Sequence, residues 1–95
     1  MIRLGVCTAA DNIDRAARTG CDYIELGFAA VADMTEAEYR RTLSLVRNSS
    51  IGVEAMNGFI PGRYRITGAE ADSAPIQEFL RGGFARAQEL GVKVV

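Results

Sequence analysis

Short segments in which apolar and other side chains alternate recur along the chain, separated by segments with helical spacing. The expected strands are residues 2–7, 22–27, 51–57 and 92–95. Between them, apolar residues recur every three or four positions, as they do on one face of a helix. Regular alternation of strands and helices is typical of a parallel sheet with right-handed crossovers. We therefore predict a mixed α/β fold with the order βαβαβαβ.

The ends of the three predicted helices carry recognisable residues. The first helix is expected to begin with Asp11 as its N-cap and to end at Gly20. The second begins with the pattern of a capping box, in which Thr35 is the N-cap and Glu38 follows three residues later. The third is expected to start near Pro75, because proline is favoured in a first helical turn.

The third helix and the connection before it have unusual sequences. Residues 58–73 form a connection of a length that is uncommon in compact domains and is often functional. Its Arg63 and Arg65 could bind a phosphate, or they could be solvated loop charges. Within the helix, Gly82 and Gly83 should each destabilise it by about 1 kcal/mol relative to Ala. Close packing against the sheet is the expected compensation.

The two faces of the predicted strands differ in character. The first is aliphatic and consists of Leu4, Val6, Ile24, Leu26, Ile51, Val53, Ala55, Val92 and Val94. The second is mostly small, polar or charged and consists of Arg3, Gly5, Cys7, Tyr23, Glu25, Gly27, Glu54, Met56, Lys93 and Val95. A doubly wound sheet has helices on both faces, whereas a barrel can keep polar side chains inside. The pattern favours a barrel, with a flavodoxin-like sheet as the alternative.

Composition excludes some classes of partner. The chain has 95 residues, of which 48% are hydrophobic, and its net charge is −1. Such a balance gives no electrostatic basis for binding nucleic acid or an anionic membrane. The apolar runs are too short to span a bilayer, and the start lacks the layout of a signal peptide. Cys7 and Cys21 are expected at opposite ends of the sheet and therefore unpaired, which indicates a cytoplasmic location.

Four segments resemble the xylose isomerase-like TIM barrels, a family that includes sugar phosphate isomerases/epimerases and relatives of endonuclease IV. They are residues 1–6 (MIRLGV), 20–26 (GCDYIEL), 53–61 (VEAMNGFIP) and 85–95 (ARAQELGVKVV). The resemblance implies an eight-stranded barrel of about 250 residues. Residues 1–95 would be one partial domain, the N-terminal half of such a barrel with its first four strands, interrupted after the fourth.

The resemblance also implies an activity for the full-length barrel, namely isomerisation or epimerisation of a sugar or sugar phosphate by metal-assisted proton transfer. In this family a divalent metal of the Mn/Mg/Zn class and the acid/base pair come from later strands. We therefore expect no catalytic or metal-binding residue here, and no activity from the 95 residues alone. A non-catalytic, self-associating or ligand-binding α/β module is the alternative. An endonuclease IV-like phosphodiesterase fragment fits poorly, because the chain has no His.

Five residues near the carboxyl ends of the strands are candidates for contacting a sugar. Glu25 could bind a substrate hydroxyl or form a structural ion pair. Glu54, on the same face, could join it in an acid/base pair, hold a cation together with it, or be paired within the core. Cys7 could line the pocket or be a small buried thiol. Asn57 could bond sugar hydroxyls and Phe59 could stack on the sugar, or both could belong to a loop stabilised by an Asn-Gly turn.

The outer strands of the predicted half barrel have consequences for association. The first and fourth strands would be open, apolar edges, and such edges promote pairing with another chain. We expect a homo-oligomer, in which the fourth strand of one copy joins the first strand of another. The sugar substrate would be the only other partner of the full-length form.

Overall fold

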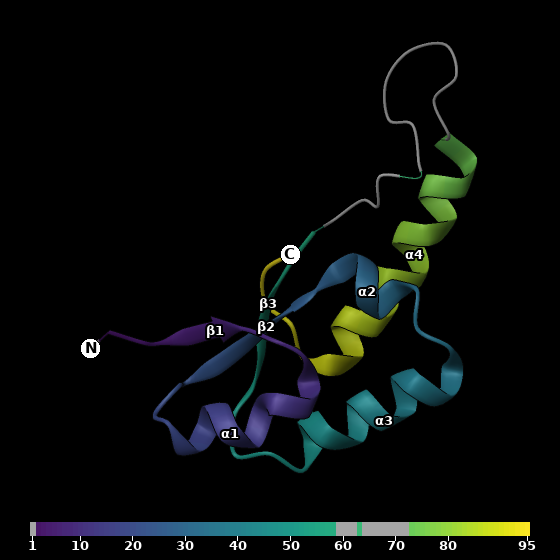
Figure 1. Cartoon of the computed structure of the whole chain (residues 1–95). Helices are drawn as coiled ribbons and strands as arrows, with labels where there is room; N and C mark the ends of the chain where they lie inside the picture. Colours follow the sequence, from purple (N-terminus) through teal and green to yellow (C-terminus); the bar gives the residue numbers. More distant parts are fainter. Residues whose placement is uncertain (1, 59–62, 64–72) are drawn as a thin grey trace.

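A three-stranded parallel sheet with helices packed on it forms the body of the protein in the computed structural model (Figure 1). The structure describes residues 2–58, 63 and 73–95. In chain order the elements are β1 (Gly5–Cys7), the 3-10 helix η1 (Ala10–Asn12), α1 (Ile13–Arg18), β2 (Tyr23–Gly27), α2 (Phe28–Ala32), α3 (Glu36–Arg47), β3 (Gly52–Asn57) and α4 (Ser73–Leu90). The predicted mixed α/β fold with parallel strands is confirmed.

The strands lie in the order β1-β2-β3, so that neighbours in sequence are neighbours in the sheet. The predicted strand at residues 92–95 is wrong as a strand. It is reduced to one parallel bridge between Val94 and Ala55. The amide of Met56 donates to the carbonyl of Val94 at 2.9 Å, and the amide of Val94 donates to the carbonyl of Glu54 at 3.1 Å. The segment therefore lies beside β3, but without the consecutive pairs that make a ladder.

A register shift in β3 overturns part of the two-face prediction. Ile24 pairs with Val53, but the next residue, Glu25, pairs with Ala55, so Glu54 is passed over. After this shift the alternation reverses, because one extra residue turns all later side chains to the other face. Met56 is therefore 5% exposed in the core, and Ala55 shares the open face with Glu25. Both had been expected on the opposite faces.

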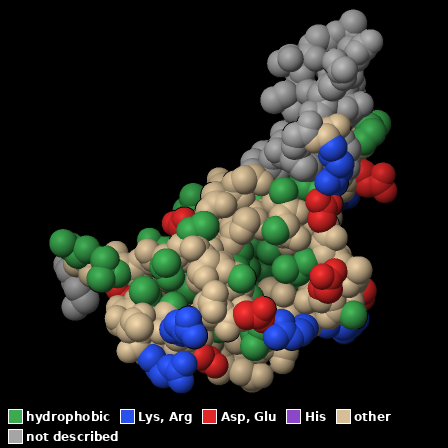
Figure 2. All heavy atoms as spheres, in the orientation of Figure 1, with side chains coloured by type: hydrophobic (Ala, Val, Ile, Leu, Met, Phe, Trp, Pro, Cys, Tyr) green, Lys and Arg blue, Asp and Glu red, His purple; other side chains and the backbone are tan. Residues whose placement is uncertain are grey.

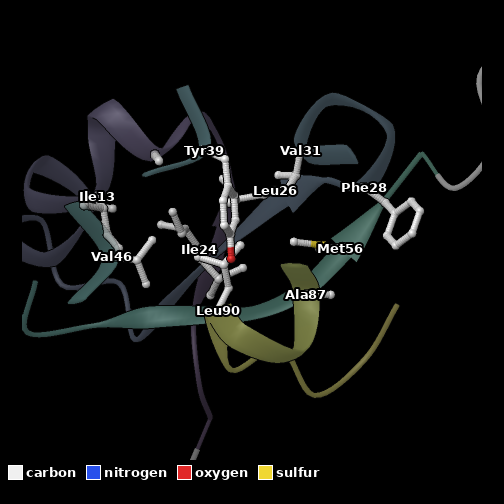
Figure 3. Close-up of a cluster of buried hydrophobic side chains, with 13 residues drawn as sticks. Ile13, Ile24, Leu26, Phe28, Val31, Tyr39, Val46, Met56, Ala87 and Leu90 are labelled. Atoms are coloured by element: carbon white, nitrogen blue, oxygen red, sulfur yellow. The ribbon is translucent and has the colours of Figure 1, made fainter. Parts of the chain in front are cut away.

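The core lies between the helices and the aliphatic face of the sheet (Figure 3). Its fully buried members include Ile13, Ile24, Phe28, Val31 and Val53. The helices thus cover the face that the sequence marks as aliphatic. At the two sides of the sheet, aliphatic residues are exposed instead. The exposed fractions are 87% for Ile2 and 60% for Leu4, just before β1, and 64% for Val94, beside β3.

Two predicted helix boundaries are confirmed. Thr35 and Glu38 form the capping box: the amide of Glu38 donates to Thr35 Oγ1 at 3.1 Å, and the amide of Thr35 donates to Glu38 Oε1 at 2.9 Å. Gly20 follows α1 with a φ of +96°. The amide of Cys21 then donates to the carbonyl of Ala16 at 3.0 Å, as in a Schellman motif.

The predicted N-cap of the first helix is wrong. A 3-10 turn precedes α1, so Ala9 is the N-cap of η1 and Asn12 that of α1, and neither side chain caps its helix. Asp11 lies inside this first turn and forms an ion pair with Arg41 of α3. The error arose because a short 3-10 turn has no periodicity by which a sequence could reveal it.

The sequence did not predict α2, whose five residues are too few for a periodic pattern. Its Phe28 is fully buried and explains one glycine of α4. A Cβ atom added at Gly83 would lie 2.4 Å from the Phe28 ring, whereas one at Gly82 would meet nothing within 4 Å. Close packing does favour glycine at position 83, but the packing is against α2 and not against the sheet. Among the described helices, none is long and apolar enough to cross a membrane.

Candidate functional site

A cavity of about 460 Å³ opens at the carboxyl ends of β1 and β2. The ends of the strands, the turn into η1, α2 and the first turns of α3 surround it. Figure 2 shows a hollow with apolar side chains near the middle of the molecule and charged side chains along its lower edge. Small-molecule sites typically have volumes of about 300–1,000 Å³. The cavity is therefore large enough for a small ligand.

Two of the residues predicted to contact a sugar, Cys7 and Asn57, meet at this cavity. They are the last residues of β1 and β3, and Gly27 of the intervening strand has no side chain to separate them. Asn57 Nδ2 donates to Cys7 Sγ at 3.2 Å. Cys7 is exposed, so its interpretation as a buried thiol is wrong. Both cysteines are free, as expected.

The polar wall of the cavity comes from residues that the sequence did not indicate as site residues. Thr8 follows β1, and its Oγ1 accepts a hydrogen bond from Asn12 Nδ2 at 2.9 Å. Asp11 of η1 and Arg41 of α3 close one side with their ion pair. Glu38 completes this wall through its position in the capping box. Only the packing of η1 against α3 brings these groups together, so no local pattern could have identified them.

Glu54 lies away from the cavity, on the open face of the sheet. Both of its carboxylate oxygens accept hydrogen bonds from the guanidinium of Arg3, which lies 5.5 Å from the centre of the Tyr23 ring. The hydrogen bonds from Arg3 lower the pKa of Glu54. This geometry favours the interpretation of Glu54 as an ion-paired residue. Glu25 is half-buried on the same face and does not line the cavity.

Of the three remaining candidates, Arg63, Arg65 and Phe59, the structure describes only Arg63. Arg63 makes a two-pronged contact with Asp33, at 2.7 and 2.8 Å, and lies 5.5 Å from the centre of the Phe79 ring. The hydrogen bonds from Arg63 lower the pKa of Asp33. Phe59 and Arg65 lie outside the described residues.

The described residues do not fit a metal. Within residues 2–58, 63 and 73–95, no three His, Cys, Asp or Glu side chains lie together in a way that could hold an ion. We therefore derive no metal-dependent step for these residues.

Comparison with known proteins adds no family assignment. No protein-family model matches the sequence, and no curated protein matches it significantly. The resemblance to xylose isomerase-like barrels therefore stays a prediction.

Proposed function

We propose that this chain supplies the first βα units of a xylose isomerase-like TIM barrel and that its cavity forms part of a sugar-binding pocket. The strand order carries the proposal. In a flavodoxin-like sheet the first strand lies between the second and third. Here β1 is at an edge, β2 is central, and Val94 lies beside β3, so the segments follow one another around the sheet. Sequential order of parallel strands is the arrangement of a TIM barrel.

The open face of the sheet supports a barrel interior. Toward the amino ends of the strands, the ring of Tyr23 packs over Gly5, where an added Cβ would lie 2.1 Å from a ring carbon. Arg3 lies over this ring and bonds Glu54, so one layer of side chains crosses all three strands. Inward side chains of TIM barrels also stack across the sheet, in layers contributed by alternate strands.

The position of the cavity supports a binding role. TIM-barrel enzymes place their sites at the carboxyl ends of the strands, where this cavity lies. Its wall combines apolar residues with a hydroxyl, an amide and carboxylates, which suits the alternating C–H and O–H groups of a sugar. Asn57 and Thr8 would bond hydroxyls, and Leu26 and Ala30 would contact the carbon skeleton. These residues would bind and orient the sugar, and proton transfer would need groups beyond them.

Titration of the ¹⁵N-labelled chain with D-fructose tests the proposal. We expect shifts of the NMR signals of Thr8, Gly27 and the Asn57 side-chain amide at millimolar concentrations of sugar, without turnover. Asn57→Ala should weaken binding by about fivefold, because one hydrogen bond contributes about 1 kcal/mol. Asn48→Ala, at the end of α3 and away from the cavity, is the matched control. The absence of shifts at the cavity with D-fructose and D-xylose would refute the proposal.

A ligand-binding module without catalysis is the second candidate, and the cavity itself favours it. The two carboxylates among its described lining residues already have partners, since Asp11 is bonded to Arg41 and Glu38 accepts from the amide of Thr35. Assays of ketose–aldose conversion with added Mn²⁺ or Mg²⁺ separate the two candidates. Binding of the sugar without turnover would favour the module.

A further inference from the structure

The charged side chains that line the cavity already have hydrogen-bond partners. Among the described residues, three charged ones line it, namely Asp11, Glu38 and Arg41. The guanidinium of Arg41 donates a hydrogen bond to the carboxylate of Asp11, and the carboxylate of Glu38 accepts one from the amide of Thr35 in the capping box. The wall therefore holds two carboxylates and one guanidinium, whose charge a carboxylate already balances.

The start of α3 offers little to an anion as well. The first turn of a helix attracts negative charge, because its amides point outward and the helix dipole is positive there. In α3 this turn already contains Glu36 and Glu38, and the amide of Glu38 is bonded to Thr35. The hydrogen bonds from the backbone and side chain of Thr35 lower the pKa of Glu38 and favour its charged form.

From this wall we propose that the cavity selects uncharged polyols and sugars over their phosphate esters. The inference rests on the proposed function and gives its substrate class. A phosphate monoester carries a charge of about −1.5 to −2 at neutral pH. It would meet an excess of carboxylates, and the one guanidinium among the described lining residues already forms an ion pair with Asp11. A neutral sugar instead donates hydrogen bonds from its hydroxyls to these carboxylates and leaves the ion pair intact.

Paired titrations of the full chain test the selectivity. The probes are D-fructose, D-fructose 6-phosphate and inorganic phosphate, and the readout is the shift of the Thr8, Gly27 and Asn57 signals. We expect D-fructose to bind at least about threefold more tightly than its phosphate, since each unit charge about 6 Å away changes affinity roughly threefold in water. Inorganic phosphate should leave these signals unchanged.

Asp11→Asn removes one negative charge and the ion pair with Arg41. The amide oxygen of the new side chain can still accept a hydrogen bond from a sugar hydroxyl. We expect this variant to raise the affinity for D-fructose 6-phosphate relative to that for D-fructose by about three- to tenfold. Asp14→Asn is the matched control, because Asp14 lies on α1 outside the cavity and its substitution removes the same charge. An equal gain in both variants would assign the effect to net charge and overturn the role of the cavity.

The outcomes separate the two proposals. Tighter binding of D-fructose 6-phosphate than of D-fructose by the natural chain would overturn the selectivity and leave the sugar-binding function standing. Binding of inorganic phosphate at the cavity would do the same. If neither sugar moves the cavity signals, the proposed function fails, and the selectivity fails with it.

Discussion

At the scale of single residues, the surrounding side chains decide how each of two adjacent glycines affects stability. Gly82 and Gly83 look equivalent in the sequence, and both should weaken a helix. In the structure Gly83 is buried under the Phe28 ring, whereas Gly82 is exposed with open space around it. The same substitution at the two glycines should therefore change the free energy of unfolding in opposite directions.

Gly83→Ala should lower the free energy of unfolding by about 1–3 kcal/mol, because the new methyl group would overlap the buried Phe28 ring. Gly82→Ala should raise it by up to about 1 kcal/mol through the better helix propensity of Ala. Urea unfolding followed by circular dichroism measures both. Equal effects of the two substitutions would contradict the packing of α4 on α2.

At the scale of elements, polar side chains of α4 hold the segments that form the cavity wall. Arg86 donates hydrogen bonds to the carbonyls of Val31 and Met34 at 2.8 and 2.9 Å, and both of these residues line the cavity. Its guanidinium lies 4.5 Å from the centre of the Tyr39 ring. The hydroxyl of Tyr39 in turn donates to Glu89. Thus α4 is joined to α2 and α3 by both packing and hydrogen bonds.

This junction predicts a loss of stability at high pH. Burial, together with the hydrogen bond to Glu89, raises the pKa of Tyr39 from 10.0 to about 12. The folded state thus favours the protonated phenol. Its contribution is complete below pH 10 and declines as the pH rises from 10 to about 12, because the unfolded chain ionises first. Urea unfolding at a series of pH values from 8 to 12 measures this.

Tyr39→Phe should flatten the stability curve between pH 10 and 12, because it removes the ionising group. Glu89→Gln should make the decline smaller and end it at a lower pH, since the acceptor charge that raises the pKa of Tyr39 in the folded state is gone. A curve for Tyr39→Phe that falls as steeply as that of the natural chain would contradict the assignment.

At the scale of the whole molecule, the sheet has an aliphatic face that its helices cover only in the middle. Ile24 and Val53 are 0% and 2% exposed, whereas Leu4 and Val94, at the two sides of the sheet, are 60% and 64% exposed. In a closed barrel, further strands and helices would cover both sides. Exposed apolar residues beside unpaired backbone promote association.

We therefore expect the 95-residue chain to self-associate through these sides. Light scattering coupled to size-exclusion chromatography should give a mass that rises with concentration above that of one chain. Leu4→Lys should reduce this association, since charged side chains oppose edge pairing. Ser44→Lys, exposed on α3, is the control. A monomeric mass at all concentrations would contradict the prediction.

Sequence patterns alone were sufficient for the features that depend on local spacing. The α/β order, the capping box at Thr35, the glycine end of α1 and most of the aliphatic face follow from contacts between residues close in the chain. The sequence also indicated that Cys7 and Asn57 lie close together, because the carboxyl ends of parallel strands lie at the same edge of a sheet.

Only the tertiary structure decided the rest. The register shift at Glu54 reversed the faces of Ala55 and Met56, and the pairing with β2 that creates it lies far away in the sequence. The same holds for the cavity wall, where Asp11 meets Arg41 across 30 positions of chain. Long-range packing sets such contacts, and local periodicity carries no information about them.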